Sequence, residues 1–263
     1  MAMRGLATRA RLAPPYSRLA SAYDAALGIP FFLGTRRAFE YLVCRYGIEF
    51  HSAADIGCGT GLFACYLSRC WGVPVFAVDR SPEMLKMAMR NCPEENICFL
   101  QQDIRCLRLP CPVDLITANF DTVNHLLSEA DLRLAFHRIA ENLRPAGHFF
   151  FDVITPCRPL GGHRCAVRRL RGAGGQLEQW IRWDPQRRAL TILVVQRYSR
   201  FSPPKVEVHG ERAYSPWQVG RELHAAGFVI RGVHDAMTLR PAYTCPPRII
   251  VVAQKRAPAH KQP

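Results

Sequence analysis

The sequence predicts an α/β fold, in which helices cover both faces of a parallel sheet and an antiparallel β extension is inserted near its end. Two observations carry this prediction. Short apolar runs alternate with stretches of helical periodicity over residues 34–155, which is the pattern of successive βαβ units. From residue 156 to 213 the chain is rich in Gly, Pro and Arg and contains consecutive strand-like runs.

The elements of the first part follow from local signals. The expected strands are short and apolar, and they cover residues 53–56, 73–79, 97–103, 113–120 and 149–154. Helical spacing predicts helices between them, at residues 34–47, 62–70, 82–90 and 129–143. Ser81 and Ser128 are typical N-cap residues, and Pro82 suits the first helical position.

The second part begins with three strand-like runs, at residues 177–183, 189–198 and 206–214. A helix is expected from Ser215 to about Gly227, followed by strands at 229–239 and 248–254. We therefore expect five parts along the chain: an N-terminal arm and cap helix (1–33), the core (34–155), an inserted β-rich basic lid (156–213), a C-terminal helix and β-hairpin that complete the core (214–255), and a disordered tail (256–263).

The net charge of +14 is unevenly distributed along the 263 residues. Residues 24–156 carry fifteen acidic and twelve basic side chains, whereas residues 157–213 carry four acidic and twelve basic ones. The basic flanks indicate an anionic partner, which could be a phosphorylated small molecule, a nucleic acid or an acidic surface. A solvated arginine-rich surface is the equally weighted alternative. The basic residues before Asp24 resemble a transit peptide, but a flexible basic arm is the preferred interpretation.

The eleven cysteines form no CxxC pair and no cluster with zinc-ligand spacing. We expect free thiols in a reducing cytosol, with no disulfide and no metal site. No run approaches the roughly 18 apolar residues of a membrane span. The sequence thus predicts a cytoplasmic protein without a membrane partner, either monomer or homodimer.

A glycine-rich loop follows the first expected strand and opens the next helix. It reads Asp55-Ile56-Gly57-Cys58-Gly59-Thr60-Gly61, and glycines there let a ligand approach the backbone at a helix N-terminus. Leu62 occupies the position that would need the third glycine of a dinucleotide fingerprint. Asp79 and Asp103 end the next two strands, so they should lie at the same ligand-binding edge of the sheet.

This D-x-G-x-G-x-G pattern resembles the first motif of class I S-adenosylmethionine-dependent methyltransferases. The resemblance covers residues 16–155 and, more loosely, 214–254, and it implies a Rossmann-like seven-stranded methyltransferase sheet with an inserted antiparallel β lid. It implies S-adenosylmethionine as cofactor. The cofactor-binding residues expected from it are Tyr23, Asp55, Gly57, Cys58, Gly59, Thr60, Gly61, Asp79, Arg80, Met84, Gln102, Asp103, Ile104, Asn119, Phe120 and Asp121. For Met84, plain helix core is an equally weighted alternative.

A narrower resemblance concerns the methyl acceptor. Tyr16 to Asp24, with its Tyr…Tyr-Asp pattern, and Phe120 to Leu126, with its F-x-x-x-x-H-L pattern, are similar to small-molecule methyltransferases, including those acting on amines of nucleotide-linked sugars. By this resemblance Tyr16 and His125 are the expected catalytic residues. A His is a plausible base because its pKa lies near neutrality. Asp121 and Asn124 depart from the sugar enzymes.

The sequence therefore predicts methyl transfer to N or O of a small metabolite, which could be anionic, by in-line displacement. Arg158, Arg164, Arg168, Arg169 and Arg171 of the lid could pair with its acidic groups. The main alternative is an RNA or protein methyltransferase that uses the basic flanks. A non-catalytic cofactor-binding domain and a thiol or arsenic acceptor are further alternatives.

Overall fold

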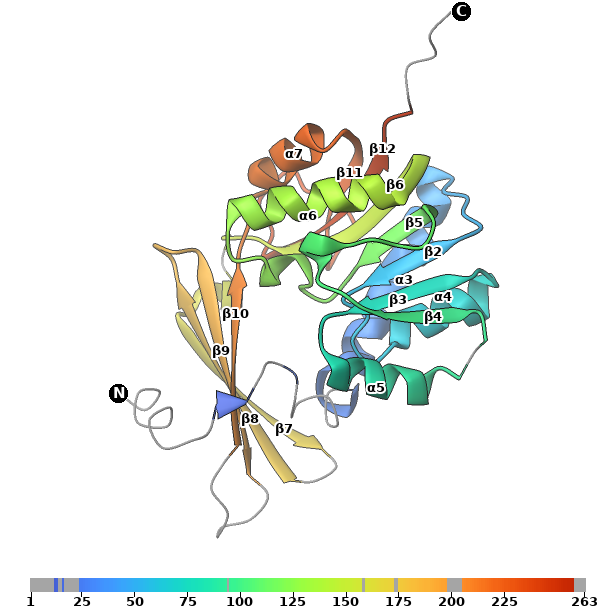
Figure 1. Ribbon diagram of the computed structural model, residues 1–263. Coiled ribbons are helices and arrows are strands. Elements are labelled where there is room, and N and C mark those ends of the chain that lie inside the picture. Colours follow the sequence, from blue (N-terminus) through green and yellow to red (C-terminus); the bar gives the residue numbers. More distant parts are fainter. Residues whose placement is uncertain are drawn as a thin grey trace, which may run out of the picture.

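The computed structural model describes residues 12–13, 16, 24–93, 95–157, 159–172, 175–197 and 205–257. In these residues the chain forms two sheets (Figure 1). The larger one has helices on both faces, and the smaller one stands beside its edge where β5 and β6 end. Arg158 and the final residues 258–263 fall outside the described ranges.

The larger sheet has seven strands in the order β11-β12-β6-β5-β2-β3-β4. Its strands are β2 (Ala53–Ile56), β3 (Val75–Asp79), β4 (Ile97–Gln101), β5 (Val113–Ala118), β6 (Leu143–Ile154), β11 (Phe228–Asp235) and β12 (Arg248–Lys255). The first five pair in parallel, whereas β12 runs antiparallel to both β6 and β11. The expected seven-stranded sheet is confirmed.

Two apolar clusters hold helices against the two faces of this sheet. The helices α3 (Ile29–Tyr46) and α4 (Leu62–Trp71) pack on one face together with α5 (Pro82–Asn91), whereas α6 (Glu129–Asn142) and α7 (Pro216–Ala225) pack on the other. Alternation along β6 explains the division, because Phe149 and Phe151 join the α6 cluster and Phe150 joins the α3 cluster. The helices thus fix the strand ends that carry the site.

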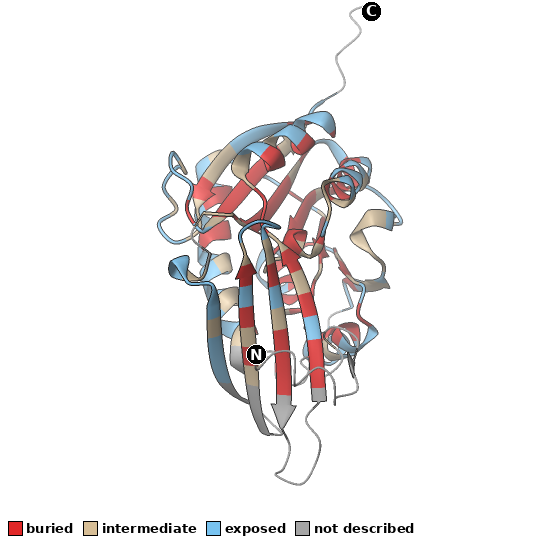
Figure 2. Ribbon diagram, turned by 90° about the vertical axis from the view of Figure 1, so that its left-hand side faces the viewer, coloured by how far each residue is buried: buried red, intermediate tan, exposed pale blue. Residues whose placement is uncertain are grey.

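The smaller sheet is the lid, which we define as the four antiparallel strands β7 (Cys165–Gly172), β8 (Gly175–Asp184), β9 (Ala189–Arg197) and β10 (Lys205–Arg212). A two-residue strand, β1 (Leu12–Ala13), pairs in parallel with β10. Figure 2 shows buried and exposed residues alternating along these strands. One face of the lid is therefore turned towards the rest of the protein.

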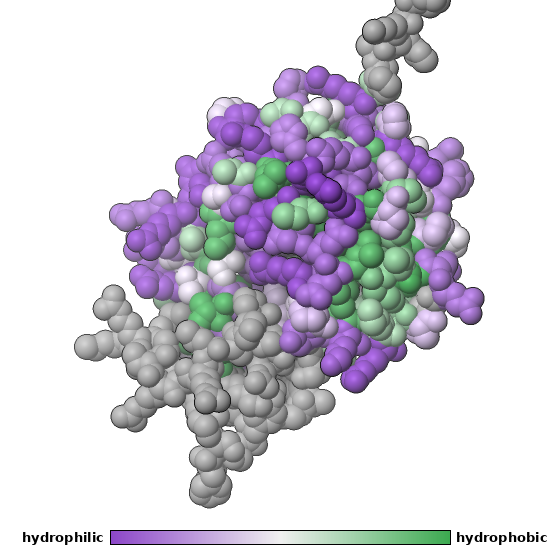
Figure 3. Space-filling model, viewed as in Figure 1, coloured by the Kyte–Doolittle hydropathy of each residue, from purple (hydrophilic) through white to green (hydrophobic). Residues whose placement is uncertain are grey.

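The expected strands and helices are all present, with shifted ends. The sequence did not indicate β7, because its arginines leave no clear apolar alternation. Strand β6 begins at Leu143, directly after α6, rather than at Phe149. No helix of the described residues is long and apolar enough to cross a membrane. Figure 3 shows largely hydrophilic side chains over α6 and α7.

The expectation that the cysteines form no disulfide is wrong. Cys157 and Cys245 are disulfide-bonded, although 88 positions separate them. The pairing of β6 with β12 brings them together, because Ile154 lies opposite Arg248. Cys157 follows the end of β6 by three residues and Cys245 precedes β12 by three. The bond therefore ties the segment that leads into the lid to the core.

Candidate functional site

The glycine loop connects β2 to α4 and forms one wall of a cavity of about 310 Å³. Gly57 has a φ of +68°, and a Cβ there would lie 2.2 Å from Oγ1 of Thr122. Only glycine permits this close approach of the loop to the turn after β5. A Cβ at Gly59 would meet no atom within 4 Å, so the space beside the loop is open to a ligand.

Asp79 ends β3 at the same edge and lines the cavity. Its carboxylate accepts hydrogen bonds from the backbone N–H groups of Gly59 and Ser81, at 2.9 and 2.8 Å. Burial raises the pKa of this carboxyl, and the two N–H donors oppose that rise. A carboxylate with two oxygens retains lone pairs for further donors, so Asp79 can also accept from a ligand.

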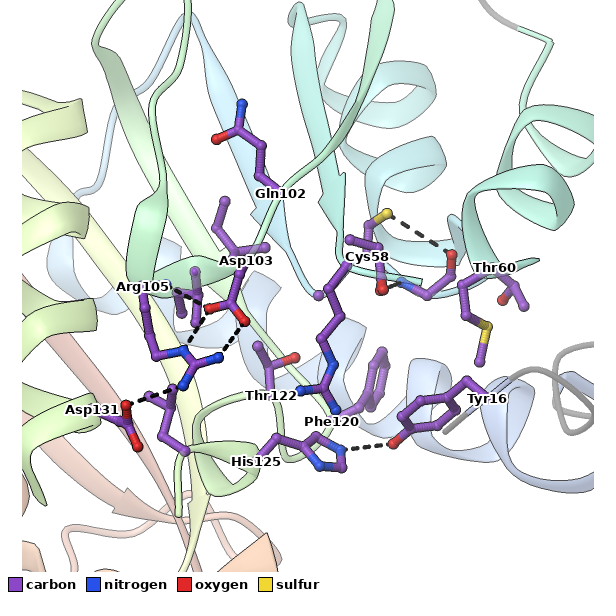
Figure 4. A pocket seen from close by; sticks show the side chains of 18 of the residues that line it. Tyr16, Cys58, Thr60, Gln102, Asp103, Arg105, Phe120, Thr122, His125 and Asp131 are labelled. Atoms are coloured by element: carbon purple, nitrogen blue, oxygen red, sulfur yellow. Dashed lines mark hydrogen bonds and ion pairs between the residues drawn. The ribbon is translucent and has the colours of Figure 1, made fainter. Parts of the chain in front are cut away.

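Asp103 follows β4 and belongs to a small ion-pair network (Figure 4). Arg105 binds it through two nitrogens, at 2.9 and 2.8 Å, and also reaches Asp131 at 3.2 Å. The hydrogen bonds from Arg105 lower the pKa of Asp103. This network forms the end of the cavity opposite Tyr16. No sequence pattern had indicated Arg105 or Asp131 as lining residues.

Most expected cofactor residues of the described chain line this cavity: Gly57, Cys58, Gly59, Thr60, Asp79, Arg80, Met84, Gln102, Asp103, Ile104 and Phe120. Four others lie beside it. Asp55 is buried under the loop, where Thr117 donates to it at 2.7 Å and burial raises its pKa to about 7. Gly61 faces Cys92 at the start of α4, Asn119 is buried at the end of β5, and Asp121 lines a second cavity.

Tyr23 lies outside the described residues. Its neighbour Asp24, which the sequence analysis did not select, accepts a hydrogen bond from Oγ1 of Thr60 at 2.5 Å. Asn91 of α5 donates to the other oxygen of the same carboxylate at 3.2 Å. The N-terminal segment is thus fastened to the glycine loop and to α5.

The turn after β5 is strained. Phe120 and Asp121 have φ values of 56° and 65°, a region that side chains other than those of Gly, Asn and Asp seldom adopt. Such strain persists only where the surroundings enforce it, which happens most often at functional sites. Arg248 of β12 provides part of that constraint, because it bonds Asp121 at 3.0 Å and also pairs with Asp152 of β6.

Tyr16 and His125, the two expected catalytic residues, are in direct contact (Figure 4). The hydroxyl oxygen of Tyr16 lies 2.7 Å from Nε2 of His125, and Nδ1 of the same ring lies 3.3 Å from the carbonyl of Gly210. A carbonyl only accepts, so Nδ1 carries the proton and Nε2 accepts from the Tyr16 hydroxyl. Burial, with a smaller contribution from the charge of Arg80, lowers the pKa of His125 to about 4.

Two lid residues hold Tyr16 in place. The carboxylate of Glu207 accepts from the backbone N–H of Tyr16 at 3.1 Å, and also lies 3.1 Å from Nε2 of His209. The ring of His209 meets that of Tyr16 edge-on, with centroids 4.5 Å apart. Tyr16 is therefore positioned from the lid, and the hydroxyl group points towards the core residue His125.

A second cavity, of about 120 Å³, lies between the lid and the turn after β5. Tyr16 and Phe120 line both cavities, so they mark the place where the two meet. Of the expected lid arginines whose side chains the structure describes, only Arg168 lines it; Arg169 is 73% exposed and pairs with Glu178, and Arg164 is exposed. The side chains of Arg158 and Arg171 lie outside the description.

The larger cavity fits S-adenosylmethionine. The open space at Gly59 and the acceptor Asp79 lie at successive strand ends, as a nucleoside bound across such a sheet requires. Its volume lies at the lower end of the range for small-molecule sites. The described residues contain no group of three or more His, Cys, Asp or Glu side chains that could hold a metal ion.

Comparisons with known proteins agree with this geometry. Residues 53–147 match a family model described as a methyltransferase domain. This segment is a methyltransferase domain. A solved S-adenosylmethionine-dependent methyltransferase from Clostridium acetobutylicum superposes with a TM-score of 0.76 at 20% identity, covering 92% of this chain and 99% of that one. The methyltransferase fold thus extends beyond the matched segment.

Curated relatives match over part of the chain. A putative methyltransferase of a Geobacillus species is 37% identical over 101 residues, which are 38% of this chain and 40% of that protein. A dTDP-3-amino-3,6-dideoxy-α-D-glucopyranose N,N-dimethyltransferase of Streptomyces fradiae is 30% identical over 106 residues, or 40% of each chain. These matches thus span about two fifths of the relatives' length.

Proposed function

We propose that this protein transfers the methyl group of S-adenosylmethionine to a nitrogen or oxygen atom of a small metabolite. The observation that carries the proposal is the meeting of two cavities at Tyr16 and Phe120. One cavity has the shape and donors of a cofactor site, and the other is enclosed by the lid. A methyl group held where they meet would face an acceptor on the opposite side, as in-line displacement requires.

The core residues would hold the cofactor. Asp79 would accept the ribose hydroxyls, Asp103 and Ile104 would border the adenine, and the loop from Gly57 to Gly61 would contact the methionine and ribose. When bound, S-adenosylmethionine supplies an activated methyl group on a positively charged sulfur. The carboxylate of Asp79 provides a negative environment for a ligand that carries such a charge.

Tyr16 and His125 would orient the acceptor. His125 is neutral at physiological pH, because its pKa lies near 4, so it is a poor proton acceptor but a good partner for the Tyr16 hydroxyl. The oxygen of Tyr16 keeps lone pairs for an N–H or O–H of the acceptor. This arrangement aims the acceptor's lone pair at the methyl group, and the released proton would pass to water.

The lid favours a small acceptor over RNA or protein. The acceptor cavity lies behind Tyr16 and between two sheets, where a polymer segment would need to displace lid strands. The prediction of an anionic partner was based largely on the arginines of the lid. Among the described lid arginines, only Arg168 lines the cavity. A cytoplasmic location and a monomeric or homodimeric state remain predictions.

The test measures transfer of tritium from S-adenosyl-L-[methyl-³H]methionine to a panel of small primary and secondary amines and alcohols. We expect transfer to at least one compound, and we expect Tyr16→Phe to lower kcat by about 100-fold, as loss of a positioned polar group does. Binding of S-adenosylhomocysteine, measured by calorimetry, should stay unchanged in that variant. Tyr243→Phe, which alters a 93% exposed side chain, is the control, and equal turnover by Tyr16→Phe and wild type would contradict the proposal.

A further inference from the structure

The inward face of the lid carries polar groups that the methyl transfer step does not use. Glu207, His209 and Glu211 alternate along β10, so their side chains share one face. Glu207 and His209 hold Tyr16. Glu211 does not contact Tyr16 in this way, although it lines the second cavity and is only 5% exposed.

Two buried side chains in this cavity are without partners among the described residues. Neither the carboxyl of Glu211 nor the side-chain amide of Gln179 makes a hydrogen bond or ion pair within that part of the chain, and each is 5% exposed. A buried polar group without a partner is destabilising, so such groups commonly mark ligand sites. Glu211 and Gln179 are available to a bound molecule.

The charges around Glu211 select the kind of group that can bind there. Burial raises the pKa of Glu211 well above its ordinary value, and the nearby carboxylates of Asp121 and Asp152 raise it further. Arg248 lowers it, but this guanidinium is already paired with both aspartates. Arg168 is the remaining cation that lowers it. An added anion would meet the charges of Asp121 and Asp152, whereas an ammonium group would favour the ionised carboxylate of Glu211 and a hydroxyl group can bond to either form.

The polar side chains of this face are separated along strand β10. His209 contacts Tyr16, and Glu211 is two residues further along β10, which is roughly 7 Å in an extended strand. Between these points the cavity wall is apolar, with Ile181 and Ile192 of the lid and Phe31 of α3 among its residues. The cavity therefore suits an apolar frame with a polar group at either end.

We propose that Glu211 binds a second ammonium or hydroxyl group of the acceptor, away from the methylated atom, and excludes acceptors with a carboxylate or phosphate there. This inference rests on the proposed function, because it assigns the second cavity to the acceptor. Glu211 is thus a specificity-determining residue, distinct from the Tyr16–His125 pair that meets the reacting group.

The test compares three probes with one amine on the same frame: 1,4-bis(aminomethyl)benzene, 4-methylbenzylamine and 4-(aminomethyl)benzoate. Their binding to the full chain with saturating S-adenosylhomocysteine is measured by saturation-transfer NMR and calorimetry. For the wild type we expect the diamine to bind most tightly and the carboxylate at least tenfold more weakly. We expect Glu211→Gln to reduce that preference and Glu211→Leu to favour the methyl compound. Glu49→Gln, on an exposed side chain, should keep the wild-type order.

Separate readouts distinguish the possible failures. If S-adenosylhomocysteine does not bind the wild type, the proposed function fails. If it binds equally to the wild type and both Glu211 variants, those variants are folded and the probe data are decisive. The inference is overturned if the carboxylate probe binds best to the wild type, if both variants keep the wild-type order, or if no probe binds to the complex.

Discussion

The core sheet and the lid contribute to one site in different ways. In the core, functional side chains lie at the carboxyl ends of successive parallel strands, as with Asp79 after β3 and Asp103 after β4. In the lid they lie along the face of a strand, as with Glu207, His209 and Glu211. The part of the site in the core is formed by strand ends and backbone geometry, which suits a cofactor that is always the same. The lid face is defined by side chains alone, which suits a variable acceptor.

The contact between the two regions is a chain of polar interactions. Glu207 of the lid holds the backbone of Tyr16, the Tyr16 hydroxyl meets His125 of the core, and Nδ1 of His125 returns to the carbonyl of Gly210 in the lid. The disulfide between Cys157 and Cys245 fastens the start of the lid to the core. The lid is thus attached to the core at the Tyr16–His125 pair as well as at its base.

The largest expected effect comes from breaking the buried charge cluster that faces the lid. Arg248→Met leaves Asp121 and Asp152 without their counter-charge, which should lower the free energy of unfolding by about 3–5 kcal/mol, as measured by urea denaturation. Arg144→Met removes a 51% exposed partner of Asp114 and should lower it by less than about 1 kcal/mol. If the two substitutions lowered the free energy of unfolding equally, the buried cluster would not stabilise the protein more than an exposed ion pair does.

The next effect concerns the pH dependence of the contact between core and lid. The pKa of His125 is near 4 in the folded protein and 6.5 in an unfolded chain. Between these values the unfolded state binds more protons, so stability falls as the pH drops from 6.5 to 4, by up to about 3 kcal/mol. The free energy of unfolding of the wild type, minus that of His125→Gln at the same pH, isolates this contribution. A difference that is constant over this pH range would contradict the burial of a neutral His125.

A substitution in the core should affect the cofactor alone. Asp79→Asn removes the carboxylate that organises the glycine loop, and it should weaken S-adenosylhomocysteine binding by about 100-fold, the equivalent of about 2.7 kcal/mol. Calorimetry measures this loss, and circular dichroism checks the fold. Probe binding to the lid cavity should change little. Unaltered binding of S-adenosylhomocysteine would refute the assignment of Asp79.

The smallest effect distinguishes two neighbouring lid arginines. Arg168→Glu, which alters a residue lining the second cavity, should change the KM of the acceptor several-fold and leave S-adenosylhomocysteine binding intact. Arg169→Glu, at a 73% exposed side chain, should change neither. Equal shifts in KM would indicate a diffuse electrostatic field of the lid rather than a defined cavity wall.

The core end of the site could be predicted from the sequence because its signals are local. Apolar runs followed by Asp79 and Asp103 locate the strand ends, and parallel pairing places them at one edge. The glycine loop is recognised by the spacing of its glycines. Tyr16 and His125 were selected from a resemblance, which did not predict their contact with each other, and burial changes the chemistry expected of the histidine by lowering its pKa.

The remaining features depend on tertiary contacts. The disulfide and the Arg248 cluster join residues that are 88 and 127 positions apart, and nothing in the local sequence points to either. Glu207, His209 and Glu211 were open to prediction, because polar residues at every second position of a strand share a face. The abundance of arginines in the lid drew attention to its net charge instead, whereas its inward face is acidic.

The most direct test of the account is a crystal structure of the protein with S-adenosylhomocysteine. We predict the ribose at Asp79, the adenine against Ile104, and the sulfur near Tyr16 and Phe120, facing the cavity under the lid. It would be contradicted by a sulfur atom that points away from the Tyr16–His125 pair, or by a ligand bound outside the cavity at the glycine loop.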